Sequence, residues 1–166
     1  ADKDVTVLVN GLSIGTDTTD VNGDYSISVT SYAASAVVTA YVDGETEDAV
    51  TVTLGTATSD DIAGLDLYSN HLIIRHENAG PITNTHLDTA NNGDLDIDAI
   101  YTTSGSPVAL TVPSAVTLRI NSGDTYAPGG NIAIAGNWDN NGAFTPAGWT
   151  VDITGTATQT VDAGVS

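Results

Sequence analysis

Cysteine and methionine are both missing from the 166 residues of this chain. Without cysteine the protein can form no disulfide bond, no thiolate metal site and no cysteine nucleophile, so its stability has to come from packing and backbone pairing. Basic residues are almost as scarce, because three Lys and Arg stand against 21 Asp and Glu and give a formal net charge of -18. Since that charge repels phosphate groups and anionic lipids, we expect no nucleic acid partner.

Long apolar runs are absent as well. No stretch approaches the roughly 20 residues needed to span a bilayer, so we expect no membrane insertion. No basic and apolar leader precedes Ala1 and there is no initiating Met, and we interpret the chain as a mature or excised segment. Hydrophobic residues still make up 40% of the chain, which favours a folded protein over a disordered one. A Cys-free, acidic and Thr-rich composition predicts an extracellular or cell-surface location in a bacterium or archaeon.

Alternating β-branched residues dominate the first third of the chain. They form strand-length runs at residues 5–9, 25–29, 37–42 and 49–54, with a weaker one near 12–16. The dipeptides Asn10-Gly11, Asn22-Gly23 and Asp43-Gly44 separate these runs and accept the positive φ of tight hairpin turns. Residues 1–56 are therefore predicted to form an immunoglobulin-like antiparallel sandwich. Four firm strands are fewer than the roughly seven of a complete sandwich, so we expect an open sheet edge.

A small, polar stretch at residues 57–64 is the predicted junction to a second module at 65–166. Beyond it, short apolar runs recur about every 10 to 20 residues, with Asn and Gly at the corners. These runs lie at 67–76, 97–102, 108–112, 116–120, 132–135, 150–154 and 158–161. The pattern indicates a second β-sandwich or a short β-solenoid. No ten-residue stretch has helical periodicity with caps, so the predicted fold class is all-β with little helix.

One C-terminal pattern resembles a known repeat. It consists of Gly136-Asn137-Trp138-Asp139-Asn140-Asn141-Gly142-Ala143-Phe144-Thr145-Pro146, a strand-like run at 150–154, and Gly155 followed by Gln159-Thr160-Val161. This order resembles repeats of giant bacterial extracellular surface proteins, as does segment 64–90, while residues 19–26 are similar to carboxypeptidase-regulatory-like and other immunoglobulin-like modules. The resemblance implies a non-catalytic building block of an extracellular stalk, layer or filament. Trp149 stands where the repeat usually has a small or polar residue, so we expect it to pack against a particular surface.

Two groups of side chains offer the oxygen ligands that calcium prefers. The first comprises Asp17, Asp20, Asn22 and Asp24, but the later bidentate Glu of a calcium loop is missing, and we favour an Asx-rich hairpin turn. The second is denser and comprises Asp88, Asn91, Asp94, Asp96 and Asp98. On a strand that begins near Asp94, its carboxylates would share one face and repel each other. Either solvation of this face or a bound calcium relieves the repulsion, and no other cofactor is predicted.

Catalytic chemistry has little support in the sequence. His71 and Arg75 would share one face of a strand while His76 lies on the other, and with His86 elsewhere the spacing favours structural histidines over a catalytic or metal site. We expect Arg75 to pair with a nearby acid such as Glu77 or Asp66. The chain has no Gly-x-Ser-x-Gly elbow and no phosphate-binding Gly loop. A glycan hydrolase with two Asp residues is the remaining enzymatic alternative, and we predict that the protein is not an enzyme.

The aromatic residues leave two alternatives. Exposed, coplanar rings of Trp138 and Trp149 would stack on sugars and indicate an adhesin or a carbohydrate-binding module. We favour a role as anchors between subunits. The predicted partners are copies of the chain, joined head to tail by β-strand complementation at residues 4–9 and 150–161, with glycans as possible further ligands. The predicted interface residues are Val5, Val7, Val9, Trp138, Phe144, Trp149, Val151 and Ile153.

Overall fold

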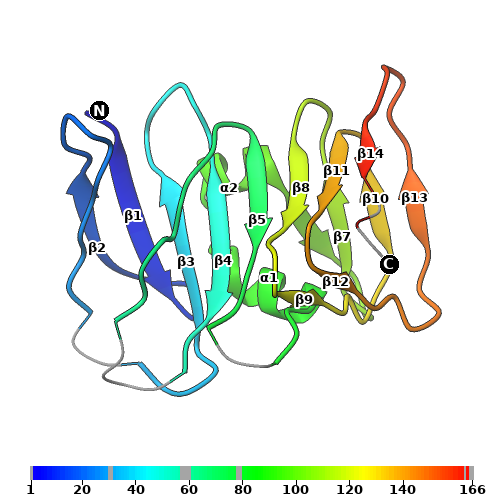
Figure 1. Ribbon diagram of the computed structural model, residues 1–166, viewed down its shortest axis with the longest axis horizontal. Helices are drawn as coiled ribbons and strands as arrows, with labels where there is room; N and C mark the ends of the chain where they lie inside the picture. The colour runs from blue at the N-terminus through cyan, green and yellow to red at the C-terminus, as the bar shows by residue number, and fades with distance from the viewer. Residues whose placement is uncertain (1, 30–31, 57–60, 78–79, 163, 165–166) are drawn as a thin grey trace.

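The computed structural model describes residues 2–29, 32–56, 61–77, 80–162 and 164 (Figure 1). Fourteen strands and two short helices lie within these ranges, which confirms the predicted all-β class. The largest sheet contains β1 (Asp4–Val9), β2 (Leu12–Thr18), β3 (Val37–Val42), β4 (Val50–Leu54), β5 (His71–Ile74), β8 (Thr117–Ile120), β11 (Asn137–Asn140) and β14 (Val161–Asp162). Its spatial order is β14-β11-β8-β5-β4-β3-β1-β2, so a single sheet runs from one end of the molecule to the other (Figure 1).

The first four strands form the antiparallel part of this sheet, in the order β2-β1-β3-β4. Asn10 and Gly11 connect β1 to β2 with φ values of 50° and 76°, as the Asn-Gly turn predicts. The Asn10 side chain also accepts a hydrogen bond of 2.9 Å from the Val37 N–H, which fixes the start of β3 against this turn. The strand predicted at residues 25–29 is wrong, because these residues lie outside every strand of the structure.

Within the large sheet the pairing is parallel from β4 to β14, whereas β6 and β7 of a smaller sheet pair antiparallel. β4 pairs with β5 through Val50 and Leu72, so the two predicted modules share one sheet across the predicted junction. Residues 57–60 of that junction lie outside the described residues. Two smaller sheets complete the coils: one contains β6 (Thr102–Ser104), β7 (Ala109–Val112), β10 (Ile132–Ile134) and β13 (Val151–Ile153), and the other contains β9 (Thr125–Tyr126) and β12 (Ala143–Phe144). One coil runs through β8, β9 and β10 and the next through β11, β12 and β13, which is the parallel stacking of a solenoid.

Side chains at equivalent positions of successive coils form the core. Leu72, Leu118 and Trp138 stack on the large sheet, and Leu110 and Ile132 stack on the second sheet, all of them buried. The same core includes Leu8, Tyr41 and Val52 of the antiparallel strands. Because one face of the N-terminal sheet contributes to this core, that sheet closes one end of the solenoid.

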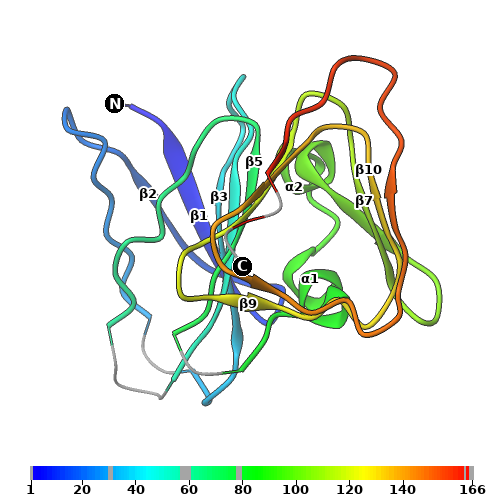
Figure 2. The ribbon, with the colours of Figure 1, turned by 45° about the vertical axis from the view of Figure 1, so that its right-hand side comes forward.

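Two helices fill the space between the large sheet and the β7–β10 sheet (Figure 2). They are α1 (Asn84–Ala90) and α2 (Leu95–Ile100). The strand predicted to begin near Asp94 is therefore wrong: Asp94 is an N-cap whose side chain accepts a hydrogen bond of 2.9 Å from the Asp96 N–H. Ile97 and Ile100 lie three residues apart, so a helix can bury both against the core. Within the described ranges, no helix has the length and apolar character that a bilayer crossing needs.

Candidate assembly surfaces

Both edges of the eight-stranded sheet are unpaired in the described part of the chain. β2 pairs with β1 on one side only, and β14 pairs with β11 on one side only. The side chains of Leu12 on β2 and Val161 on β14 are 71% and 53% exposed. Figure 1 shows the two edge strands at opposite ends of the molecule. Each end therefore offers backbone N–H and C=O groups beside an exposed aliphatic side chain, a combination that templates pairing with another chain.

The strand that the sequence predicts at the N-terminal edge of the sheet, residues 4–9, does not lie at that edge. β1 lies between β2 and β3 and is paired along both sides, so residues 4–9 are not a free edge. Val5, Val7 and Val9, which were predicted to lie at an interface, are buried in a cluster with Val38 and Ala40. The edge is β2 instead, where the sequence showed only a weak run because Gly15 and Asp17 interrupt the aliphatic alternation.

The C-terminal group of predicted interface residues converges on the last coil. Phe144 and Val151 pack against the core from β12 and β13 while remaining partly exposed, and Ile153 is 46% exposed at the unpaired side of β13. Among the described residues, β13 pairs with β10 alone. The open coil, which we define as residues 143–162, therefore presents apolar side chains at positions that the next coil would cover.

The two tryptophans do not form a shared platform. Trp138 is only 6% exposed, and its ring packs edge-on against Phe144 with 4.7 Å between the ring centroids. Trp149 is 37% exposed, in the connection between β12 and β13. Because Trp138 is a core residue, it offers no free face to a sugar ring or to another subunit. The structure therefore contradicts both the alternative of a two-ring sugar platform and the favoured role of Trp138 as an anchor between subunits.

Polar side chains at the corners explain the Asn-rich and Gln-containing motif. Asn131 accepts a hydrogen bond of 3.1 Å from the Thr150 N–H, and Asn137 accepts one of 2.9 Å from the Thr160 N–H, so each asparagine holds the coil that follows it. The Gln159 amide donates to the Ile134 carbonyl at 3.1 Å and also to Gly136. These bonds satisfy the backbone groups that a strand leaves unpaired where it turns a corner.

One corner position must be glycine because the backbones of two successive coils approach each other closely there. A Cβ atom on Gly136 would lie 1.8 Å from the Val116 carbonyl oxygen of the preceding coil. Only glycine allows the two corners to stack at this distance.

The denser acidic group is divided by the structure. Asp94 and Asp96 meet Asp43 of the β3–β4 turn, with one oxygen of each carboxylate within 4.8 Å of the others. Burial, together with the charges of Asp94 and Asp43, raises the pKa of Tyr41 beside this group. The sequence did not indicate Asp43, because its place before Gly44 is fully explained by a hairpin turn.

The other members of the predicted calcium site have separate partners. The Asn91 amide donates to Asp98 at 2.8 Å, and the Thr103 hydroxyl donates to Asp88 at 2.6 Å. One converging oxygen from each of the three carboxylates of Asp43, Asp94 and Asp96 gives three ligands, fewer than the six to eight oxygens that calcium takes. Calcium binding at the five predicted residues stays a prediction, and of these five the structure brings only Asp94 and Asp96 into one carboxylate group.

The first acidic group forms the predicted turn. Asp20 accepts hydrogen bonds from the backbone N–H groups of Asn22 at 2.7 Å and Asp24 at 3.0 Å. These bonds, with the one from Asp24 foremost, lower the pKa of the Asp20 carboxyl. Asp17 accepts a bond of 2.8 Å from the Ser26 N–H and so attaches the turn to β2.

The three histidines have separate contacts. His71 Nδ1 lies 2.8 Å from the Ser69 carbonyl oxygen, His76 Nε2 accepts from the Thr125 N–H at 3.0 Å, and His86 Nδ1 accepts from the Thr83 N–H at 3.2 Å. Their ring nitrogens thus bond to three different parts of the backbone, which agrees with a structural role. Arg75 forms the predicted ion pair with Glu77.

Comparison with known proteins identifies no relative. A scan against protein-family models and searches of curated proteins and of solved structures each found no match to the chain. The resemblance to repeats of giant surface proteins therefore stays a prediction.

Proposed function

We propose that this chain is a structural unit of an extended assembly, in which copies join end to end by strand addition. One observation carries the proposal: a single eight-stranded sheet spans the molecule and, among the described residues, ends on each side in a strand that is paired along one edge only. Placing β14 of one copy beside β2 of the next would continue the sheet from copy to copy. The added backbone hydrogen bonds supply affinity, and the side chains beside them set the register.

The exposed side chains at these two ends support the same arrangement. Leu12 and Ile14 on β2 and Ile153 and Val161 at the open coil are among the largest exposed apolar side chains of the described residues. Burying apolar surface stabilises a contact by roughly 25 cal/mol per Å². The composition and the resemblance of the C-terminal repeat suggest that the assembly is an extracellular filament or stalk on a bacterial surface, with a mechanical rather than a catalytic role.

The test uses two variants that block one end each. Leu12→Lys places a charge on the β2 edge, and Val161→Lys places the same charge on the β14 edge, because an edge lysine opposes strand addition. Light scattering coupled to size exclusion and electron microscopy at neutral pH report the assembled state. We expect filaments or oligomers from the unmodified chain and monomers from each variant alone.

Mixing the two variants distinguishes the possible geometries. In a head-to-tail assembly, the free β14 edge of Leu12→Lys meets the free β2 edge of Val161→Lys, so the mixture gives dimers and stops there. If Leu12→Lys alone still dimerises while Val161→Lys does not, the contact joins two open coils and the head-to-tail arrangement is wrong. An unmodified chain that stays monomeric at high concentration and high salt would refute the structural proposal.

A further inference from the structure

A hollow of about 250 Å³ lies on the outer face of the large sheet, away from both of its edge strands. Thr51, Ile73 and Arg119 are paired neighbours on β4, β5 and β8. They share the outer face because successive side chains of a strand alternate, and Leu72 and Leu118 beside them belong to the core. The sheet thus presents a threonine, an isoleucine and an arginine in one row across three strands.

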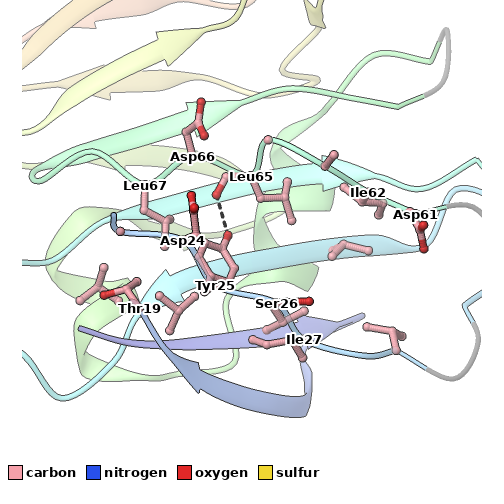
Figure 3. A pocket seen from close by; sticks show the side chains of 18 of the residues that line it. Thr19, Asp24, Tyr25, Ser26, Ile27, Asp61, Ile62, Leu65, Asp66 and Leu67 are labelled. Atoms are coloured by element: carbon pink, nitrogen blue, oxygen red, sulfur yellow. Dashed lines mark hydrogen bonds between the residues drawn. The ribbon is translucent and has the colours of Figure 1, made fainter. Parts of the chain in front are cut away.

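One wall of this hollow is the segment at residues 64–68, which lies on the outer face. The Thr51 hydroxyl donates to the Asp66 carbonyl at 2.6 Å and so holds the segment against β4. Figure 3 shows the Asp66 side chain on the other side of the segment from Tyr25. We define the outer hollow as the space between residues 64–68 and residues 119–122.

Polar side chains on both walls have no hydrogen-bond partner in the part of the chain that the structure describes. The Nε atom of Arg119 is buried without a partner, and its Nη1 lies 3.6 Å from the Asp139 carboxylate, which is longer than a hydrogen bond. The Asp66 carboxylate and the Asn121 amide form no hydrogen bond with a described residue either. Because the Arg119 side chain is 36% exposed, its terminal nitrogens can donate to a ligand.

Two apolar side chains contribute to the lining as well. Ile73 is 2% exposed, and the Tyr68 ring is 48% exposed and lies beside Arg119, with 5.9 Å between the ring centroid and the guanidinium carbon. Ligand sites combine an apolar lining with a few convergent polar groups, and those for drug-sized molecules have about 300–1,000 Å³. The outer hollow is slightly smaller, so it has room for one small ring.

Charge decides which class of ligand fits these groups. The carboxylates of Asp66 and Asp139 outnumber the guanidinium of Arg119, and the whole chain has a formal charge of -18, so an anion is disfavoured. A cation would leave the guanidinium donors unmatched. A hydroxyl both donates and accepts, so a neutral ring with several hydroxyls can bond to the carboxylate and to the guanidinium at once.

We propose that the outer hollow binds a neutral pyranose sugar. The sugar hydroxyls would donate to the Asp66 carboxylate and accept from the Arg119 terminal nitrogens and the amide of Asn121. The C–H groups of the sugar would contact the exposed part of the Tyr68 ring. Neither β2 nor β14 contributes to this hollow, so the inference is independent of end-to-end assembly.

The experiment uses the full chain carrying both Leu12→Lys and Val161→Lys, so that blocked ends keep the copies apart. Amide NMR spectra follow titrations with the methyl glycosides of glucose, galactose and mannose, and with glucuronic acid and glucosamine as charged comparators. We expect at least one neutral glycoside to shift the signals of residues 64–68 and 119–122 saturably. The dissociation constant should be millimolar, because one ring buries little surface. Both charged comparators should bind more weakly.

Two alanine variants of one segment provide the matched comparison. Asp66→Ala should weaken sugar binding at least about tenfold, as expected for the loss of a hydrogen bond to a charged group. The fold should be retained, because the Asp66 carboxylate forms no hydrogen bond with a described residue. Asp61→Ala removes the same charge from the same segment outside the hollow and should leave binding unchanged.

Three results would overturn the inference. The first is the absence of a saturable shift with all three neutral glycosides. The second is binding of glucuronic acid as tight as that of the best neutral glycoside, which would identify an anion site. The third is equal weakening by Asp66→Ala and Asp61→Ala, which would place the sugar elsewhere. Failure of end-to-end assembly would leave this measurement unaffected, because it is made on blocked chains.

Discussion

Single polar residues decide how tightly the coils of this protein are joined. Asn84 is fully buried, and its amide donates to the carbonyl groups of Val108 at 2.8 Å and Asn131 at 3.2 Å, while its oxygen accepts from the Tyr126 hydroxyl. One side chain thus joins α1 to two corners and to a core tyrosine. A buried polar group of this kind is stabilising only while all its partners are bonded.

Replacing Asn84 with alanine should therefore be costly. The change removes the partner of the Val108 carbonyl and of the Tyr126 hydroxyl, while the Asn131 carbonyl keeps its bond from the Leu110 N–H. We expect the free energy of unfolding to fall by roughly 2–5 kcal/mol, since each unsatisfied buried group costs about 1–3 kcal/mol. Urea denaturation measures the loss. The control is Asn22→Ala in an exposed turn, and equal stability of the two variants would contradict the role assigned to Asn84.

The elements of the fold differ in how well local sequence predicts them. The alternating runs of β1, β3 and β4 and the Asn10-Gly11 turn follow from local rules, and all lie where the sequence places them. Helix α2 does not follow from such rules, because Leu95 and Ile97 alternate with the Asp residues on either side of them, as in a strand. The helix is preferred because Asp94 caps it and because Ile97 and Ile100 reach the core together. That benefit depends on packing against distant strands, which no local pattern records.

Helix α1 should respond to pH through its cap. Thr83 and His86 form a capping box in which His86 Nδ1 accepts from the Thr83 N–H, and a protonated ring cannot accept. Burial lowers the pKa of His86 from its ordinary 6.5 in the folded protein. Its contribution to stability is therefore full above pH 6.5 and is lost as pH falls through the lower folded value. We expect the loss to be less than the about 1 kcal/mol of a typical cap.

His86→Gln tests this response, since glutamine at the same position accepts the bond at any pH. Free energies of unfolding at pH 7.5 and 5.5 should differ less for His86→Gln than for the unmodified chain, with His71→Gln as the control that retains the full difference. If His86→Gln and His71→Gln show the same pH dependence, the cap is not the sensor.

For the molecule as a whole, the sequence predicts strands better than it predicts which strands are neighbours. Phe144, Val151 and Ile153 lie on β12 and β13 of the open coil, and their place in an interface stays a prediction. The N-terminal edge was assigned to β1 and belongs to β2, because strand order depends on which strands pair after turns that look alike in sequence. The parallel pairing of β4 with β5 is likewise a contact between distant residues.

Net charge should control whether copies associate. Each copy has a formal charge of -18, so association brings like charges together. Raising salt from about 0.01 M to 0.15 M shortens the Debye length from about 30 Å to about 8 Å, and we expect light scattering to show longer assemblies at the higher salt. The blocked Leu12→Lys variant should show no such growth. Shortening of the assemblies with salt would indicate that ion pairs rather than strand edges join the copies.

The direction of the strands has a mechanical consequence. They lie across the long axis of the molecule, so the hydrogen bonds between them point along it (Figure 1). Each coil is held by its immediate neighbours. We expect tension along the axis to pull on these bonds lengthwise and to detach β14 first, because β14 pairs with β11 at two positions whereas the other edge strand, β2, pairs with β1 at six. Under such a load the molecule would lengthen one coil at a time from its open end.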